Sequence, residues 1–110
     1  MIEIDISKIE PVFHSPIRIA ILSILISAIE ADFKYLKKAT KTTDGNLSSH
    51  LSKLEKEGFI EIKKSFSEKK PLTTCRITKK GKKAFLKYIN IIDDVINIAR
   101  SAKTENNDKN

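Results

Sequence analysis

The chain has 110 residues, of which 40 % are hydrophobic, and it carries a net charge of +7 at pH 7. This length allows a single hydrophobic core, so we expect one domain, over residues 1–102. No apolar run reaches the roughly 18 residues that a membrane-spanning helix needs. One cysteine excludes an internal disulfide, and the acidic N-terminus is unlike a secretory signal peptide. We therefore expect a cytoplasmic protein without a membrane partner.

The first predicted helix covers residues 15–31, with Ser15 as a suitable N-cap and Pro16 in the first turn. Apolar side chains occupy most of its circumference in two stripes, so other apolar surface must cover most of it. We expect one stripe to pack within the domain. The other is expected to meet a second copy of the chain, and it consists of Ile19, Leu22, Ile26 and Ile29. The alternative is that this helix is central to the fold of a single chain.

A second feature is the helix predicted over residues 44–57, which follows a sharp turn and a preceding helix from about Asp32. Three leucines recur on one face at helical spacing, Thr43 or Asp44 can cap the start, and Gly58 stands where a left-handed stop is needed. The opposite face carries short polar side chains, which can approach a surface closely and bond base edges or phosphates. The candidate DNA contacts on this helix are Thr43, Asn46, Ser48, Ser49, Ser52 and Lys53.

Residues 59–63 and 73–77 alternate between apolar and polar side chains, which predicts the two half-buried strands of a hairpin. The loop between them is expected over residues 65–71. The hairpin is basic, and its candidate phosphate contacts are Lys63, Lys64, Lys69, Lys70 and Arg76. A charged hairpin tip is often only solvated, but this one directly follows the candidate DNA-contacting helix.

Positive charge is concentrated on these elements. Residues 33–89 hold 16 Lys and Arg against 5 Asp and Glu, whereas residues 1–32 and 90–110 are both net acidic. Such concentration is expected for a polyanion partner. Helix, turn, helix and basic hairpin together are the plan of a winged helix-turn-helix. We therefore predict a mainly α fold with a small β-hairpin, a DNA-binding core over residues 11–78, helix 44–57 in the major groove and a wing, residues 63–76, on the backbone.

The last predicted helix begins after Thr78 and runs over residues 79–102. At 1.5 Å per residue it is roughly 37 Å long, so its second half extends beyond the basic core. Its apolar stripe therefore predicts a dimerisation helix that pairs with a second copy. The expected contacts are Tyr88, Ile92, Val95, Ile96 and Ala99. Residues 103–110 lack hydrophobic anchors and are expected to be disordered.

The chain resembles the winged-helix transcriptional regulators of the MarR and ArsR type, especially small archaeal and bacterial members. The resemblance covers residues 12–92 and rests on the segments 14–22, 44–51, 54–60 and 77–81. It implies a homodimer, usually a repressor, whose two recognition helices enter successive major grooves of a pseudo-palindromic operator. Such proteins often carry an arginine near Ser49, but helix 44–57 has none. Arginine is the commonest reader of guanine, so we expect modest sequence specificity on a strong electrostatic background.

Two other functions are open at this stage: an architectural protein that coats DNA without an operator, and a winged-helix module that holds a protein partner. We expect no enzymatic activity, because no catalytic pairing, glycine-rich phosphate loop or nucleophile motif is present. His14, His50 and Cys75 have no metal-ligand spacing, so we expect neither metal nor cofactor. We interpret His50 as structural and Cys75 as a core residue, with a thiol redox switch as the lesser alternative.

Overall fold

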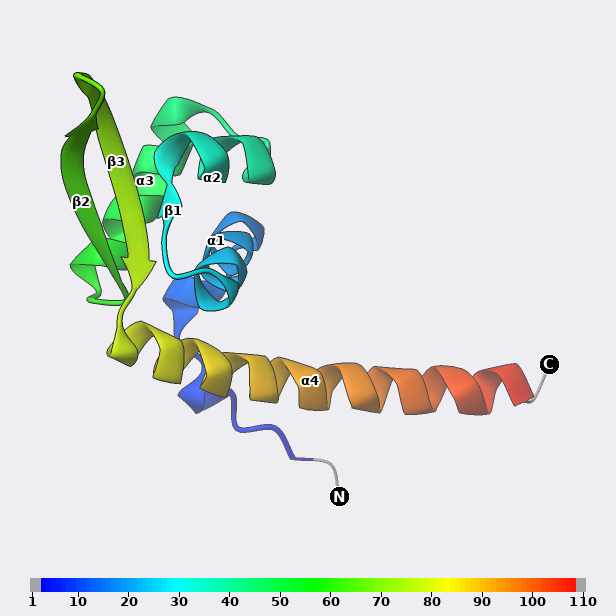
Figure 1. The fold of residues 1–110 in the computed structure, drawn as a ribbon. Helices are drawn as coiled ribbons and strands as arrows, with labels where there is room; N and C mark the ends of the chain where they lie inside the picture. The colour runs from blue at the N-terminus through cyan, green and yellow to red at the C-terminus, as the bar shows by residue number, and fades with distance from the viewer. Residues whose placement is uncertain (1–2, 109–110) are drawn as a thin grey trace.

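The computed structural model describes the backbone of residues 3–108 and the side chains of residues 3–102. Within this part, three helices and a small sheet form a body from which a fourth, long helix projects (Figure 1). The predicted fold class is confirmed. In chain order the elements are two 3₁₀ turns η1 (Ile6–Lys8) and η2 (Pro11–Phe13), then α1 (Pro16–Ser27), β1 (Ala31–Asp32), α2 (Phe33–Thr40), α3 (Asp44–Lys56), β2 (Ile60–Ser67), β3 (Lys70–Ile77) and α4 (Lys79–Asp108).

Side-chain caps fix where α1 and α3 begin, as the sequence predicts. The Ser15 hydroxyl accepts a hydrogen bond from the Arg18 amide at the start of α1, at 3.3 Å. Thr43 accepts from the amide of Asn46 at the start of α3, at 3.2 Å, which decides between the two predicted caps. Each bond satisfies an amide that has no partner within its helix.

The core lies where α1, α3, the sheet and the first half of α4 meet. Phe13 of η2 is at its centre and is fully buried. Its ring centroid is 4.8 Å from that of Phe59, and 5.6 Å from those of both Phe85 and Tyr88. This aromatic cluster joins the N-terminal segment to α4, and such ring pairs add to the stabilisation from apolar burial.

The sheet has three antiparallel strands in the order β1-β3-β2, one more than predicted. Helix α1 ends at Ser27 rather than near residue 31, because the chain turns to an extended conformation at Ala28. Ala31 and Asp32 then pair with Cys75 and Thr74 of β3. A two-residue strand is too short to show the alternation from which strands are predicted.

The hairpin is longer than expected, and its turn is shorter. β2 and β3 pair as far as Ser67 and Lys70, so only Glu68 and Lys69 form the turn where a loop over residues 65–71 was predicted. Both turn residues have positive φ, 52° and 67°. Such two-residue hairpin turns usually contain Asn or Gly, so the sequence carried no turn signal here. We use the word wing for this β2–β3 hairpin, residues 60–77.

Helix α4 begins as predicted after Thr78 and continues beyond Ala102 to Asp108. The disordered tail predicted from residue 103 stays a prediction. Residues 109–110 of that tail lie outside the described residues. Among the apolar residues of α4, Ala84, Phe85, Tyr88 and Ile92 pack against the core, and all of them lie in its first half. The molecule is 64 Å in its longest dimension, since α4 projects away from the body (Figure 1).

Two of the predicted dimer contacts belong to the core of the single chain. Leu22 is fully buried in α1, and Tyr88 is 3 % exposed within the aromatic cluster. Their side chains are already covered, so neither is available to a second copy. The expectation failed because helical spacing shows which apolar residues share a face. It does not show which of them pack against other parts of the same chain.

Candidate nucleic-acid interface

The turn between α2 and α3 holds the two helices in a defined orientation. Lys41 ends α2 with φ of 51°, a left-handed conformation that redirects the chain. Across the turn, Lys37 Nζ lies 2.8 Å from Asp44 Oδ1. Asp44 is in the first turn of α3, where a carboxylate also interacts favourably with the helix dipole. These contacts fix the orientation of α3 relative to α2.

Helix α3 has one buried and one exposed face. Leu47, Leu51 and Leu54 are at most 2 % exposed and attach the helix to the core. All six predicted contact residues lie exposed on the remaining surface: Thr43, Asn46, Ser48, Ser49, Ser52 and Lys53. The exposed face is therefore built from small hydrogen-bonding side chains on a rigidly held helix.

Three of these six side chains also have partners within the chain. The Thr43 hydroxyl accepts the capping hydrogen bond but keeps its own proton to donate. Asn46 Nδ2 donates to Thr42 Oγ1 at 2.9 Å. Lys53 Nζ lies 3.6 Å from Glu57 Oε1 on the surface. Because exposed contacts of this kind contribute little, they orient these side chains without occupying them fully.

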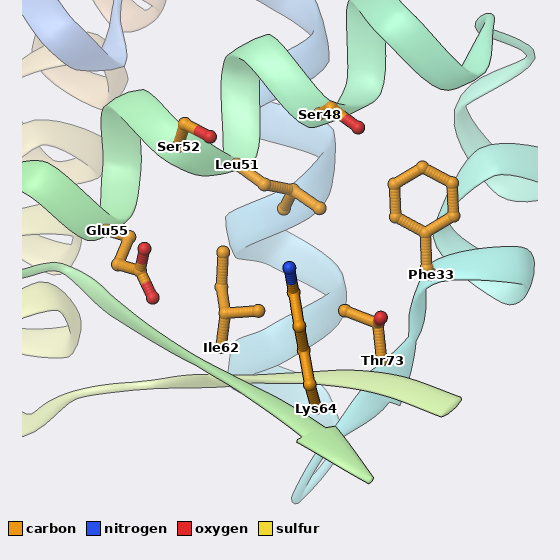
Figure 2. Close-up of a pocket in the computed structure, with 8 residues that line it drawn as sticks. All are labelled: Phe33, Ser48, Leu51, Ser52, Glu55, Ile62, Lys64 and Thr73. Atoms are coloured by element: carbon orange, nitrogen blue, oxygen red, sulfur yellow. The ribbon is translucent and has the colours of Figure 1, made fainter. Parts of the chain in front are cut away.

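A groove separates α3 from the wing, and Figure 2 shows the side chains that line it. Its volume is about 630 Å³. Ser48 and Ser52 project from α3 on one side, while the Lys64 side chain points up from β2 toward the helix on the other. The complete lining is Phe33, Ser48, Leu51, Ser52, Glu55, Ile62, Lys64 and Thr73.

The register of the wing divides its predicted contact residues into separate groups. Side chains alternate between the two faces of a strand, so Lys64 shares a face with Ile62, which lines the groove. Lys63 and Arg76 stand on the opposite face, and Arg76 Nε lies 3.6 Å from Glu30 Oε2. Lys69 and Lys70 are at the tip. The structure therefore brings Lys64 together with α3 but does not bring Lys63 or Arg76 there.

Arg18 of α1 contacts α3 on the side that faces the core. Its Nη1 lies 2.9 Å from His50 Nδ1 on α3, and its Nε donates to the Val12 carbonyl oxygen in η2. A guanidinium group only donates, so His50 Nδ1 accepts and the ring proton is on Nε2. The structural role predicted for His50 agrees with this arrangement. Desolvation first, and the Arg18 charge second, lower the pKa of His50 below its usual 6.5.

Cys75 lies inside the core on β3 and is fully buried, as predicted. Desolvation, with a smaller contribution from the Glu55 carboxylate, raises the pKa of its thiol to about 11. At neutral pH the thiolate is therefore scarce, and thiolate is the reactive form in oxidation and disulfide exchange. This geometry argues against the thiol redox switch that the sequence left open.

Five of the residues that line the groove were not among the predicted contacts: Phe33, Leu51, Glu55, Ile62 and Thr73. Thr73 is the cross-strand partner of Lys64, so a correct hairpin register would have found it. Phe33 follows the short strand β1, which carried no sequence signal. Among residues 3–108, we find neither a group of acidic, histidine or cysteine side chains suited to a metal ion nor a helix long and apolar enough to cross a bilayer.

Known proteins share both sequence and fold with this chain. Residues 17–96 match the family described as winged helix DNA-binding domain. An uncharacterized protein of Methanocaldococcus jannaschii is 45 % identical over 78 residues, which are 71 % of this chain and 85 % of that protein. The solved structure of a transcriptional regulator homologue from Pyrococcus horikoshii is 27 % identical. The two structures superpose with a TM-score of 0.75, and the match covers 80 % of this chain and 87 % of the Pyrococcus chain.

Two more distant structures share the fold. A MarR family transcriptional regulator from Silicibacter pomeroyi is 23 % identical with a TM-score of 0.62, over 76 % of this chain and 54 % of its own. The transcriptional repressor CouR, solved bound to a 23-mer DNA duplex, is 16 % identical with a TM-score of 0.71, over 94 % of this chain and 74 % of its own. The predicted winged-helix resemblance is confirmed by the family match, and these two structures show the same fold.

Proposed function

Because the chain belongs to the winged helix DNA-binding domain family, we propose that it is a dimeric transcriptional regulator that binds specific sites on double-stranded DNA and acts as a repressor. The observation that carries the proposal is the groove between α3 and the wing. There an exposed face of small hydrogen-bonding side chains stands opposite a lysine. One side offers base and phosphate contacts and the other neutralises phosphate charge.

In the proposed complex α3 lies in the major groove. Asn46, Ser48, Ser49 and Ser52 face the base edges and nearby phosphates, while Thr43 and Lys53 bond the backbone at the two ends of the helix. Lys64, Lys69 and Lys70 contact phosphates from the wing. We leave Lys63 and Arg76 out of the interface, since both stand on the face of the sheet turned away from α3 and away from the tip. Lys70 shares that face but adjoins the turn, so we keep it as a contact of the tip.

The second half of α4 supports the proposed homodimer. Val95 and Ile96 are 38 % and 40 % exposed, and they lie beyond the residues of α4 that pack against the core. A protruding helix with an apolar stripe is stabilised when the same stripe of a second copy covers it. We assign the contact to Ile92, Val95, Ile96 and Ala99. Ile29, two residues after the end of α1, is 83 % exposed, and Ile19 and Ile26 of α1 are half-buried; they complete the proposed surface.

Sedimentation tests the dimer directly. Wild-type protein is expected to sediment as twice its 12.5 kDa chain mass. Replacing both Val95 and Ile96 with Ser is expected to yield folded monomers, since neither side chain contributes to the core of the single chain. A monomeric wild-type protein at micromolar concentration would contradict the dimer without affecting the DNA-binding groove.

The role of the groove is tested by adding a negative charge to it. Ser52→Glu places a carboxylate on the face of α3 that meets the phosphates, and like charges facing each other across an interface cost several kcal/mol. We expect DNA affinity to fall at least about tenfold. Ser23→Glu is the matched control, because it makes the same change at an exposed position of α1 outside the groove. Equal affinity of the two variants would contradict the proposed interface.

One observation favours a second candidate function, an architectural DNA-binding protein. Helix α3 has no arginine, so it lacks the side chain that most often reads guanine by two hydrogen bonds. An architectural protein would use the same groove and lysines but would bind all sequences alike. A regulator prefers its site by roughly a thousandfold or more. In either role we propose that the protein is not an enzyme and that it acts in the cytoplasm.

A further inference from the structure

The wing tip carries an exposed aromatic side chain that the proposed contacts do not use. Phe66 is 76 % exposed, whereas the other four phenylalanines of the chain are buried or half-buried in the body. The Phe66 ring adds no stability to the fold through burial, because it lies outside the hydrophobic core. The residue therefore points to a partner.

Its position follows from the hairpin register. Phe66 pairs with Pro71, and alternation places this pair on the same face as Lys64 with Thr73 and as Ile62 with Cys75. Outward from the core, this face of the wing is thus apolar, then basic at the groove, and apolar again at the tip. The apolar tip is the outer end of the surface that we propose for DNA.

The charged residues around Phe66 indicate what kind of partner it would contact. Lys64 stands two residues before it on the same face, and Lys69 and Lys70 follow at the turn. One acidic residue, Glu68, is nearby. An apolar ring among lysines does not suit another apolar protein surface, because burying it there would strip the lysines of water. It suits a polyanion that also offers apolar surface, as sugars and base edges do in a DNA groove.

The reach of the wing fits the neighbouring minor groove. Ile62, next to α3, is four residues from Phe66, a distance of roughly 13 Å along a strand. With α3 in the major groove, the centre of the adjacent minor groove is half of a 34 Å helical turn away, roughly 17 Å. The two distances agree to within about 4 Å. In the view of Figure 1 the tip of the wing lies beyond the ends of α2 and α3.

Resting on the proposed DNA-binding function, we propose that Phe66 enters the minor groove beside the recognition helix and acts there as an apolar wedge. Phenylalanine and proline are among the side chains that proteins insert into this groove. Pro71 is the cross-strand partner of Phe66 and shares its face of the hairpin. A wedge favours sequences that deform easily, so Phe66 supplies part of the specificity that α3 lacks without arginine.

A tryptophan reporter tests the placement, because the chain has no tryptophan of its own. In the Phe66→Trp variant, adding a duplex from the chain's upstream region at low salt is expected to quench the emission and to protect it from acrylamide. The control is Ile6→Trp, at an equally exposed position in the N-terminal segment, 73 % against 76 %. Its emission is expected to stay the same. Unchanged emission of the Phe66→Trp variant on DNA that anisotropy shows to be bound would overturn the wedge.

Affinity gives a second readout. Phe66→Ala is expected to weaken binding roughly 10- to 100-fold, the scale of burying one phenyl ring. The salt dependence should not change, since no charge is removed. Phe66→Leu, which keeps an apolar wedge, is expected to restore most of the affinity. If Phe66→Ala binds as wild type does, the wedge is wrong while the groove stands. If wild-type protein binds no duplex at low salt, the proposed function itself fails, and the wedge with it.

Discussion

At Gly81, in the first turn of α4, we expect one added methyl group to lower the stability of the fold strongly. A Cβ built there would lie 2.0 Å from the carbonyl oxygen of Phe59 and 2.8 Å from its carbonyl carbon. Both are backbone atoms, so no side chain can rotate away, and α4 would have to move by more than 1 Å in the Gly81→Ala variant.

That movement would break the contacts that fix α4 to the end of α3. The Thr78 amide donates to the Phe59 carbonyl at 3.0 Å, and the Thr78 hydroxyl donates to the Gly58 carbonyl at 2.7 Å. Lys80 Nζ donates to the Glu57 carbonyl at 2.8 Å. Each hydrogen bond contributes about 1 kcal/mol net. We therefore expect Gly81→Ala to lower the free energy of unfolding by about 3 kcal/mol, before any loss of core packing.

Urea unfolding followed by circular dichroism measures this difference. Gly45→Ala, in the first turn of α3, is the matched control, because an added Cβ there meets nothing within 4 Å. Removing a helical glycine without a clash is expected to raise stability by about 0.5–1 kcal/mol. If Gly81→Ala unfolds at the urea concentration of the wild type, the close approach of α4 to Phe59 is wrong, and so is the position of α4 that follows from it.

Three further predictions concern charge and protonation. Lys64→Ala is expected to reduce the slope of log affinity against log salt by about 0.9, whereas Lys63→Ala, on the opposite face of β2, leaves it unchanged; titrations at several salt concentrations compare the two. The lowered pKa of His50 means that the native chain binds fewer protons than the unfolded chain below pH 6.5. The stability it contributes is thus present above pH 6.5 and is lost as pH falls through the folded pKa. His50→Gln should flatten this fall in urea midpoints between pH 7.5 and 5; an identical fall in both proteins would contradict the assignment. Cys75, with its pKa raised to about 11, should react with a thiol reagent at pH 7 only after denaturant is added, and rapid labelling of the native protein would show the thiol to be accessible.

The sequence predicted the elements that carry strong local signals. Apolar spacing and caps located α1, α3 and the start of α4, and alternation located the wing strands, because each depends on near neighbours. Strand β1 and the wing turn could not be predicted in this way. Ala31 and Asp32 form a strand because β3 is beside them, and Glu68 and Lys69 adopt positive φ because the strands on both sides pair fully. Tertiary context decided both.

Local sequence signals also predicted part of the candidate site, and tertiary context determined the rest. The exposed residues of α3 follow from helical periodicity, and all six are exposed. The side of the wing on which each lysine stands depends on register, which is why Lys63 and Arg76 were grouped with Lys64. Leu22 and Tyr88 were misplaced because periodicity finds apolar stripes but not what covers them. Contacts between distant segments, such as Arg18 with His50, left no local signal.

The most direct test of sequence-specific DNA binding is fluorescence anisotropy with two labelled duplexes, one from the chain's own upstream region and one of the same composition in scrambled order. Both are titrated at low and at near-physiological salt. A regulator of its own promoter is predicted to prefer the upstream duplex, and to keep that preference as salt weakens binding to the scrambled one. Equal binding to both that disappears with salt would contradict sequence-specific regulation at this site, and no binding to either at low salt would contradict DNA binding altogether.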